Sequence, residues 1–500
     1  MQYHSTRDNG VSVSAAEAIK KGLSTEGGLF VPESFPKMSL DEIKSLAPMS
    51  YNERAKLILG KYLTDFTKEE LDNCVDSAYT AAKFESENTA PLHKLNDTTY
   101  FLELWHGPTC AFKDMALQIL PHLMTTSMKK TGEKDEIVIL VATSGDTGKA
   151  ALEGFKDVNG TRIIVFYPNN GVSEIQKLQM VTQEGNNVSV AAVEGNFDDA
   201  QNGVKKIFTD SEYAELLGRN SFKLSSANSI NWGRLVPQIV YYFSAYADML
   251  ASGDIECGEK INVVVPTGNF GNILAAYYAS KMGLPIARFI CASNENNVLT
   301  DFIKTGEYNK NRDFHTTMSP SMDILISSNL ERFLYDLTDK NDGVVADWMK
   351  QLVEKGVYTV SDTVKEKLQS LFSAGCCDDK ATIEAIRKTA KEYGYVIDTH
   401  TAVAKAVYDG YVAETGDTTK TVIASTASPF KFNQSVLIAL EDHNAVLGKD
   451  EFTLLQELSD KSGMKIPASL AALKNKPIAF DLVCGKDEMQ QIVSDFLMVE

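Results

Sequence analysis

An alternation of short apolar runs and helix-like stretches, beginning near residue 96, most limits what this chain can fold into. The apolar runs are rich in β-branched residues, and we predict them as strands over residues 99–104, 137–142, 162–167, 188–193, 261–266, 287–292 and 421–425. Helical patterns separate them, near 115–130, 147–157, 173–184, 198–209, 232–250 and 272–282. Wholly apolar strands separated by helices are typical of a parallel sheet covered on both faces. The pattern therefore predicts a doubly wound, mostly parallel α/β protein.

The chain is expected to divide into three parts. Residues 1–95 mix short turns with helical segments and are predicted as an α-rich N-terminal domain, in which Thr67 and Glu70 have the spacing of a capping box. Residues 96–440 are predicted as the α/β catalytic region, with a large and a small subdomain and further helices near 362–374, 379–393 and 400–414. Residues 441–500 are predicted as a helical tail that packs on this region.

Composition excludes several classes of function. The net charge of −18 argues against nucleic acid or an anionic membrane as a partner, because both require a cationic surface. Seven scattered cysteines without a Cys-x-x-Cys spacing predict neither a disulfide framework nor a zinc site. The first residues are polar and no apolar run approaches the length of a bilayer span, so we expect a soluble, cytoplasmic enzyme.

Lys113 lies in a segment, residues 103–114, whose composition suits a buried turn. Trp105, Phe112 and an apolar run after the lysine flank it, and Gly107-Pro108 breaks the backbone just upstream. Burial disfavours the ammonium form, so this lysine can become a nucleophilic amine or form a Schiff base. The alternative is a lysine whose stem packs on the core while its charged end reaches solvent.

The junction over residues 142–148 has the composition of an anion-binding loop. Its small residues and hydroxyls, Thr143, Ser144, Gly145 and Thr147, precede a predicted helix, where free backbone N–H groups suit a carboxylate or phosphate. A nucleotide-binding P-loop needs four residues between its first glycine and Gly-Lys, followed by Ser or Thr. Here two residues intervene and alanine follows, so the P-loop interpretation fails.

A second junction, residues 266–272, is rich in glycine and asparagine. Gly268 and Gly271, with asparagines between and after them, can wrap backbone amides around a phosphate dianion. The alternative is an ordinary tight turn between a strand and a helix. The segment is not a Gly-x-Gly-x-x-Gly fingerprint, which disfavours a dinucleotide.

Two further segments carry polar groups that suit a ligand. Residues 425–431 form a hydroxyl-rich turn after the last predicted strand, where a neutral hydroxyl can bond an aromatic ring nitrogen or simply cap a helix. Residues 225–237 concentrate amides and hydroxyls around Arg234, which suits an oxyanion. A solvated loop that caps the helix from Trp232 is the alternative.

Taken together, these segments resemble threonine synthase, a pyridoxal-phosphate enzyme family of fold type II, related to the β subunit of tryptophan synthase. The resemblance extends along most of the chain and the motifs occur in order. They are Tyr3-x-Ser-Thr-Arg7, Gly27-Gly-Leu-Phe-Val-Pro32, His106-Gly-Pro-Thr-x-Ala-Phe-Lys-Asp114, Thr143-Ser-Gly-Asp-Thr-Gly148, Ser226-Ala-Asn-Ser-Ile-Asn-Trp-Gly-Arg234, Gly268-Asn-Phe-Gly-Asn272 and Ser425-Thr-Ala-x-Pro-x-Lys-Phe432. The set is similar to the long bacterial and fungal form, with a domain ahead of the cofactor region.

The resemblance implies a role for each motif. Lys113 would form a Schiff base with pyridoxal 5′-phosphate, and Thr426 would meet the pyridine nitrogen. The cofactor phosphate would lie against Gly268, Asn269, Phe270, Gly271 and Asn272. The substrate carboxylate would bind Thr143, Ser144, Gly145 and Thr147, and the candidates for the substrate phosphate are Thr109, Asn228, Asn231 and Arg234, with Lys431 weaker. His106 is expected to shape the lysine turn.

Two positions depart from the pattern of related enzymes. Asp146 stands where many relatives of this fold carry asparagine beside the cofactor ring, although aspartate is usual in this branch. An anion there alters the charge next to the ring hydroxyl, which leaves the role of Asp146 open. Ser428 stands where histidine is expected before the proline, so no role is assigned to that position.

The resemblance implies the activity of a carbon–oxygen lyase that acts on a phosphate ester. The substrate would be O-phospho-L-homoserine, converted with water to L-threonine and phosphate by γ-elimination and β-addition of water, the last step of threonine biosynthesis. One alternative is a related phospholyase that gives a 2-oxo acid. Another is a catalytically silent binding protein, which intact lysine and glycine motifs disfavour. The expected partner is this small-molecule substrate, and the expected oligomeric state is monomer or homodimer.

Overall fold

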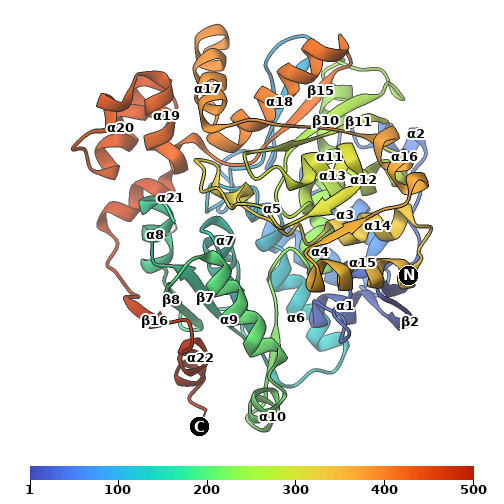
Figure 1. Cartoon of the computed structure of the whole chain (residues 1–500), viewed down its shortest axis with the longest axis vertical. Helices are drawn as coiled ribbons and strands as arrows, with labels where there is room; N and C mark the ends of the chain where they lie inside the picture. The colour runs from blue at the N-terminus through green and yellow to red at the C-terminus, as the bar shows by residue number, and fades with distance from the viewer. Residues whose placement is uncertain (171, 500) are drawn as a thin grey trace.

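The computed structural model describes residues 1–170 and 172–499, whose strands form two large, mostly parallel sheets and two small antiparallel ones. One large sheet has the strand order β14-β11-β10-β15-β5-β4 and the other has the order β16-β8-β7-β6-β9. Figure 1 shows the first in the upper half of the molecule and the second in the lower half. Helices cover both, which confirms the prediction of a doubly wound α/β fold.

The predicted strands of the α/β region lie within two residues of their expected bounds. Those of the six-stranded sheet are β5 (Thr99–Glu103), β10 (Ile261–Pro266), β11 (Ile286–Ser293) and β15 (Thr421–Ser425). Those of the five-stranded sheet are β6 (Glu136–Ala142), β7 (Thr161–Pro168) and β8 (Val188–Glu194). Their apolar residues are buried, apart from Ile286 and Ala287 at the start of β11, as expected for strands covered on both faces.

The sequence pattern missed the edge strands of the two large sheets. They are β4 (Leu92–Lys94), β9 (Phe222–Ser225), β14 (Phe372–Cys376) and β16 (Leu482–Gly485). Each is short and only partly buried, so none shows the wholly apolar run of a central strand. Their pairing with β5, β6, β11 and β8 comes from the tertiary structure.

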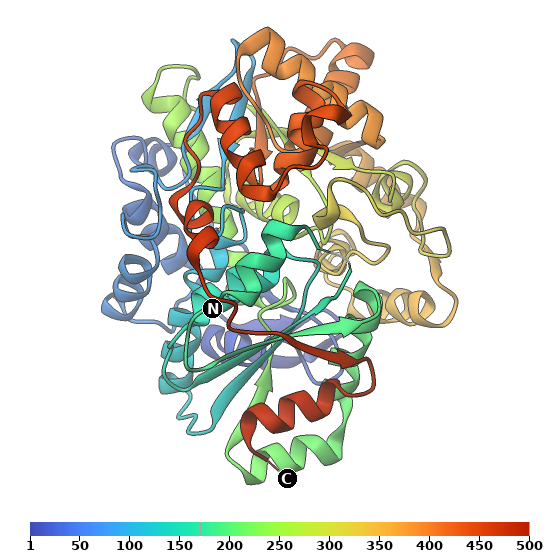
Figure 2. The same cartoon turned by 90° about the vertical axis from the view of Figure 1, so that its left-hand side faces the viewer.

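The C-terminal tail is not wholly helical. α19 (Asn433–Leu440) ends the catalytic region. The helices of the tail are α20 (Glu451–Ser462), α21 (Ala468–Ala471) and α22 (Met489–Leu497), and β16 lies between the last two. β16 pairs in parallel with β8, and the backbone N–H groups of Ala479 and Phe480 donate to Val181 O at 2.8 and 3.0 Å. Figure 2 shows this red strand lying along the green sheet. The tail therefore leaves the six-stranded half and completes the five-stranded one.

The helices between the strands include all those predicted, one of them divided in two, and two that were not predicted, over 211–219 and 298–305. They are α5 (Asp114–Leu117), α6 (Leu120–Lys130), α7 (Asp146–Phe155), α8 (Glu174–Val181), α9 (Phe197–Thr209), α10 (Ser211–Arg219), α11 (Trp232–Ala251), α12 (Gly271–Met282) and α13 (Val298–Thr305). One helix was predicted over 115–130. Pro121, in the first turn of α6, lacks the N–H that would continue α5, so the chain forms two helices instead.

The N-terminal part combines helices with a sheet of order β2-β1-β3. Its elements are β1 (Tyr3–Ser5), β2 (Asp8–Val13), α1 (Ala15–Lys21), β3 (Phe30–Pro32), α2 (Leu40–Ser45), α3 (Tyr51–Tyr62) and α4 (Lys68–Ala78). The capping box predicted at Thr67 and Glu70 is present at the start of α4. Arg7 forms an ion pair with Glu331 at 2.7 Å, so this part is anchored on the six-stranded half.

After α13 the chain supplies the outer helices of the six-stranded half. They are α14 (Leu330–Leu337), α15 (Asp342–Glu354), α16 (Asp362–Leu371), α17 (Asp379–Tyr393) and α18 (Thr399–Thr415), with β12 (Glu307–Asn309) and β13 (Val357–Thr359) as a separate antiparallel pair. No helix within the described ranges is both long and apolar enough to cross a membrane.

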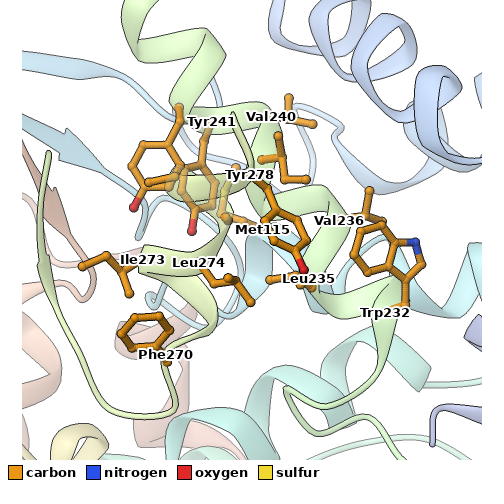
Figure 3. Packing of buried hydrophobic residues seen from close by; sticks show 14 of the residues in the cluster. Met115, Trp232, Leu235, Val236, Val240, Tyr241, Phe270, Ile273, Leu274 and Tyr278 are labelled. Carbon is orange, nitrogen blue, oxygen red and sulfur yellow. The ribbon is translucent and has the colours of Figure 1, made fainter. Parts of the chain in front are cut away.

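The centre of the molecule is the long helix α11. Almost every residue of α11 is buried, and Figure 3 shows Leu235, Val236 and Tyr241 packing toward Ile273 and Leu274 of α12. This packing positions the first turn of α12, where the glycine-rich junction lies, against a rigid core. Tight packing of this kind keeps backbone groups in place for a ligand.

Candidate active site

Lys113 lies where the carboxyl ends of strands from both large sheets meet. It follows β5 in the six-stranded sheet, and its Nζ is 4.0 Å from the Asp146 carboxylate, which follows β6 in the five-stranded sheet. The lysine is 8% exposed, and its Nζ lies 4.5 Å above the centre of the Phe112 ring. In open α/β sheets ligands bind at this edge. The solvent-reaching alternative for Lys113 is wrong, because the side chain is buried.

The turn before Lys113 is closed by Asp114. The Asp114 carboxylate accepts hydrogen bonds from Thr109 N and Thr109 Oγ1, both at 2.8 Å. A Cβ at Gly107 would lie 2.5 Å from Asp114 Cβ, so only glycine fits there. Burial raises the pKa of Asp114 to about 6. The Thr109 hydroxyl, predicted to bind substrate phosphate, is therefore already bonded within the turn.

Backbone hydrogen bonds join the lysine turn to the hydroxyl-rich turn after β15. Phe112 N donates to Thr426 O at 2.8 Å, and Ser428 N donates to Cys110 O at 3.0 Å. Thr426 is buried and lies 313 residues after Lys113 in the chain, and this backbone pairing brings the two turns together. Ser428 caps the short helix that follows. The two predicted segments thus form one structural unit.

Asp146 lies between two buried lysines. Lys431, fully buried, pairs with Asp146 Oδ1 at 2.6 Å, and Lys113 lies on the other side at 4.0 Å. Gln176 Nε2 and Ser321 Oγ donate to the same carboxylate at 2.9 and 3.4 Å. Burial opposes its charge, but the two lysines outweigh burial and place the pKa of Asp146 well below its usual range.

The electrostatics around Lys113 favour a partly neutral amine. Burial lowers the pKa of Lys113 to about 8, the negative charge of Asp146 opposes this, and the positive charges of Arg234 and Lys431 add to it. An amine with a pKa near the working pH can accept and return protons. Lys431 was predicted only as a weak phosphate ligand, whereas the structure pairs it with Asp146.

The glycine-rich junction presents free donors at the start of α12. Phe270 begins the helix with φ of 62° and no side-chain cap, which leaves first-turn N–H groups available. Asn272 Oδ1 accepts from Tyr241 OH at 2.8 Å and from Tyr242 OH, while its buried Nδ2 has no acceptor among the described residues. A Cβ at Gly268 would lie 2.7 Å from Ser321 O. These donors fit the phosphate of the predicted cofactor.

The predicted carboxylate loop is shaped by Thr143. Its hydroxyl accepts hydrogen bonds from Gly145 N at 3.0 Å and Gly148 N at 2.9 Å, while Ser144 and Thr147 are partly exposed. Gly145 has φ of 131°, and a Cβ there would lie 2.4 Å from Gln176, so the turn requires glycine. The loop keeps two hydroxyls accessible for a ligand.

The predicted phosphate residues of the 225–237 segment have different surroundings. Arg234 is buried, which lowers its pKa to about 10. Its Nη1 donates to Ala227 O at 2.9 Å, and its Nε has no acceptor in the part of the chain described here. Asn231 Nδ2 donates to Ile19 O and Ser226 O, so this amide joins α11 to α1. Arg234 retains a donor for a ligand, whereas the Asn231 side chain is satisfied by the protein.

His106 lies at the side of the lysine turn. Its Nε2 is 2.6 Å from Glu103 Oε2, and its ring stacks on Trp105 with centroids 4.2 Å apart. Trp105 in turn donates to Ser425 Oγ at 3.0 Å. These contacts agree with the expected role of His106 in shaping the turn, and that role stays a prediction.

Sequence reasoning missed a buried pair, Asp398 and His400. Asp398 Oδ2 bonds His400 Nδ1 at 2.9 Å, and His400 Nε2 accepts from Ser321 N at 3.1 Å. Ser321 lies between Asp146 and Gly268, so the pair supports the segment that joins the two loops. Asp398 also caps the N-terminus of α18, and this capping position is the only signal of the pair that can be recognised in the sequence.

Replacing His400 should separate its two contacts. In His400→Gln the amide reaches Ser321 N but not Asp398, and in His400→Asn it reaches Asp398 but not Ser321. Since the Ser321 contact positions the loops, we expect the asparagine variant to lose about tenfold in cofactor affinity and the glutamine variant clearly less. Spectrophotometric titration with pyridoxal phosphate measures both. Equal losses in the two variants would contradict this reason.

Comparisons with known proteins agree along the chain. Residues 2–79 match the model of the threonine synthase N terminus, residues 84–363 that of pyridoxal-phosphate-dependent enzymes, and residues 401–493 that of the threonine synthase C-terminal region. Human threonine synthase-like 1 is 43% identical over 85% of this chain. The chain spans 58% of the length of that relative.

Two further relatives match over nearly their full length. Threonine synthase from Pseudomonas aeruginosa is 37% identical over 87% of this chain and 90% of its own. The crystal structure of pyridoxal-phosphate-bound threonine synthase from Brucella melitensis superposes with a TM-score of 0.86 at 34% identity, over 99% of this chain and 98% of its own. The chain therefore belongs to the threonine synthase family of pyridoxal-phosphate-dependent enzymes, and pyridoxal 5′-phosphate is its cofactor.

Proposed function

We propose that this protein is a threonine synthase, which converts O-phospho-L-homoserine and water to L-threonine and inorganic phosphate. The observation that carries the proposal is the buried Lys113 amine, in a structure that also holds two groups of free donors, the first turn of α12 and the Arg234 side chain. One group suits the cofactor phosphate and the other suits the phosphate of the substrate. The agreement with threonine synthases over both ends of the chain supports the same assignment.

Each group of site residues can be assigned a separate role in this reaction. When bound, pyridoxal phosphate supplies an electron sink that stabilises negative charge on the amino acid attached to it. Lys113 Nζ, with its pKa lowered to about 8, can take a proton from the α-carbon and return it later. We assign the substrate carboxylate to the hydroxyls and N–H groups of residues 143–147. Arg234 Nε is the donor assigned to the leaving phosphate.

The charges of the site match a doubly anionic substrate. Lys113, Lys431 and Arg234 are buried, and Asp146 pairs with the two lysines, so the site brings three cationic side chains together with this buried carboxylate. Cationic side chains in a desolvated site strengthen the binding of a phosphate ester and of the phosphate that leaves.

We further propose that the chain divides into an N-terminal domain, a catalytic region and a tail. The strand β16 of the tail belongs structurally to the catalytic region, because it pairs with β8.

The competing activity is elimination without the final addition of water at the β-carbon. A phospholyase would convert O-phosphohomoserine and water to 2-oxobutyrate, ammonia and phosphate. The similarity to human threonine synthase-like 1 specifies neither product, while the match to bacterial threonine synthase favours synthesis. Both activities use the same lysine and the same phosphate donors, so the product distinguishes them.

The experiment is product analysis with the purified, cofactor-loaded protein. With O-phospho-L-homoserine we expect L-threonine and phosphate in equal amounts, with 2-oxobutyrate as a minor product. O-phospho-L-threonine serves as the control substrate, since a phospholyase should convert it to 2-oxobutyrate. Release of phosphate with 2-oxobutyrate and ammonia as the main products would contradict the proposal.

A further inference from the structure

Residues 327–329 lie directly against the glycine-rich junction. Ser327 Oγ donates to Gly268 O at 2.7 Å, and Asn329 N donates to Asn269 O at 3.1 Å. Asn329 immediately precedes α14 and is fully buried. A segment almost sixty residues further along the chain therefore forms one wall of the predicted phosphate site.

The orientation of the Asn329 amide follows from its neighbour Arg332. Arg332 Nη1 donates to Asn329 Oδ1, and a guanidinium can only donate, so Oδ1 is the acceptor and Nδ2 points away from it. Arg332 is itself fully buried, with Nε donating to Phe30 O at 3.0 Å and Nη2 to Ile230 O at 2.6 Å. These contacts leave the amide little freedom to rotate.

The Asn329 Nδ2 donor faces the start of α12. It is buried and has no acceptor among the described residues. A Cβ built on Gly271 would lie 3.5 Å from this nitrogen, so the donor borders the small space above Gly271, whereas Gln238 Nε2, 3.8 Å from the same Cβ, already donates to Arg234 O. A buried N–H without an acceptor costs free energy, which an anion in this space would recover.

We propose that Asn329 Nδ2 donates a hydrogen bond to the phosphate group of the cofactor, and that Arg332 is the positioning residue that aims it. The inference rests on the proposed assignment of residues 268–272 to that phosphate. A neutral amide adds a donor without adding charge, in a site that already contains Lys113, Lys431 and Arg234. Asn272 Nδ2, in the first turn of α12, is a second buried donor that has no acceptor among the described residues.

The test compares pyridoxal phosphate with pyridoxal, which lacks the phosphate. The full-length protein is freed of cofactor, and the affinity for each compound is measured by absorbance titration in wild type, Asn329→Ala and Asn329→Asp. We expect pyridoxal phosphate affinity to fall about tenfold in the alanine variant and further in the aspartate variant, whose carboxylate repels phosphate. Pyridoxal affinity should stay within about twofold of wild type. An equal loss for both compounds would overturn the proposal.

Two further variants separate this proposal from its premise. Gly271→Ala adds a methyl group at ordinary contact distance, so the protein should fold but bind pyridoxal phosphate more weakly. If Gly271→Ala weakens binding and Asn329→Ala does not, the junction binds phosphate without Asn329 and the inference is wrong. If neither has an effect, the assignment of residues 268–272 is wrong as well.

The stability of the cofactor-free protein gives a second readout. Asn329→Ala removes an unsatisfied donor but also the Oδ1 acceptor of buried Arg332 Nη1, so its thermal midpoint without cofactor should fall, and the rise on adding pyridoxal phosphate should also shrink. Asn187, which donates to Phe155 O and Thr161 O far from the site, provides the matched control. Asn187→Ala should lower the midpoint without cofactor and keep the full rise. The same pattern in Asn329→Ala would show a merely structural role.

Discussion

Replacing Lys113 by alanine is expected to lower kcat by at least about a thousandfold, because the chain then loses the amine assigned to proton transfer. The side chain is buried with a pKa lowered to about 8, and its nearest charged partner, Asp146, cannot replace it as a base because its own pKa is far too low. Steady-state kinetics with O-phosphohomoserine measures the loss. Borohydride reduction followed by peptide mass analysis should locate the cofactor on Lys113 in wild type and on no residue in the variant.

Lys405 supplies the control for this prediction. It is also a buried lysine, but it pairs with Asp409 within α18, away from the strand ends. Lys405→Ala should keep both the reduced cofactor adduct and most of the activity. A stable adduct on another lysine in Lys113→Ala, with activity retained, would show that the central assignment is wrong.

The pKa of Lys113 also predicts how pH affects the cofactor-free protein. The folded-state pKa of about 8 lies below the ordinary value of 10.5, so between these values the unfolded chain binds more protons. Stability should therefore rise as pH increases from about 8 to 10.5, and the buried charge is a full cost below pH 8. Lys113→Met should remove this rise and stabilise the cofactor-free protein at pH 7 by about 2 kcal/mol. Urea unfolding at several pH values checks the sign.

Breaking the ion pair between Asp146 and Lys431 is expected to cost about 3–5 kcal/mol of folding free energy. Both groups are buried and 2.6 Å apart, and Lys431 also donates to Thr109 O at 3.0 Å. Asp146→Asn leaves Lys431 and Lys113 as two buried positive charges without their shared carboxylate. Lys431→Met leaves Asp146 with Lys113 alone, at 4.0 Å. Urea unfolding of the cofactor-free variants at pH 7 measures each loss.

The double variant tests whether the cost comes from an unpaired charge. Asp146→Asn with Lys431→Met removes both ions, so it should be more stable than the sum of the single losses predicts, by about 2 kcal/mol or more. Lys149→Met with Glu153→Gln provides a comparison pair on α7, where the coupling should be smaller because Glu153 is partly exposed. If the losses in unfolding free energy of the two single variants simply add in the double variant, the losses come from packing and not from an unpaired charge.

Local sequence determined the central strands and the main loops of this protein. The β-branched runs and the turn residues between them predict β5, β6, β10 and β15, and a glycine-rich turn before an apolar helix predicts the junction at 268–272. These signals are local because strand periodicity, helix capping and positive φ depend on neighbouring residues. The Gly-Pro turn and flanking aromatic residues predicted only a candidate at Lys113, and its role came from the ordered motifs that resemble the family.

Only the tertiary structure decided which distant groups meet. It pairs Lys431 with Asp146, supports Ser321 with His400, aims Asn329 at Gly271 and adds β16 to β8. It also shows that the amide of Asn231, predicted for a ligand, bonds Ile19 instead. The order of strands in a sheet and the packing of helices across it set these contacts. The local sequence around a charged or amide side chain does not identify its ion-pair or hydrogen-bond partner, because burial and distance in the folded protein determine that partner.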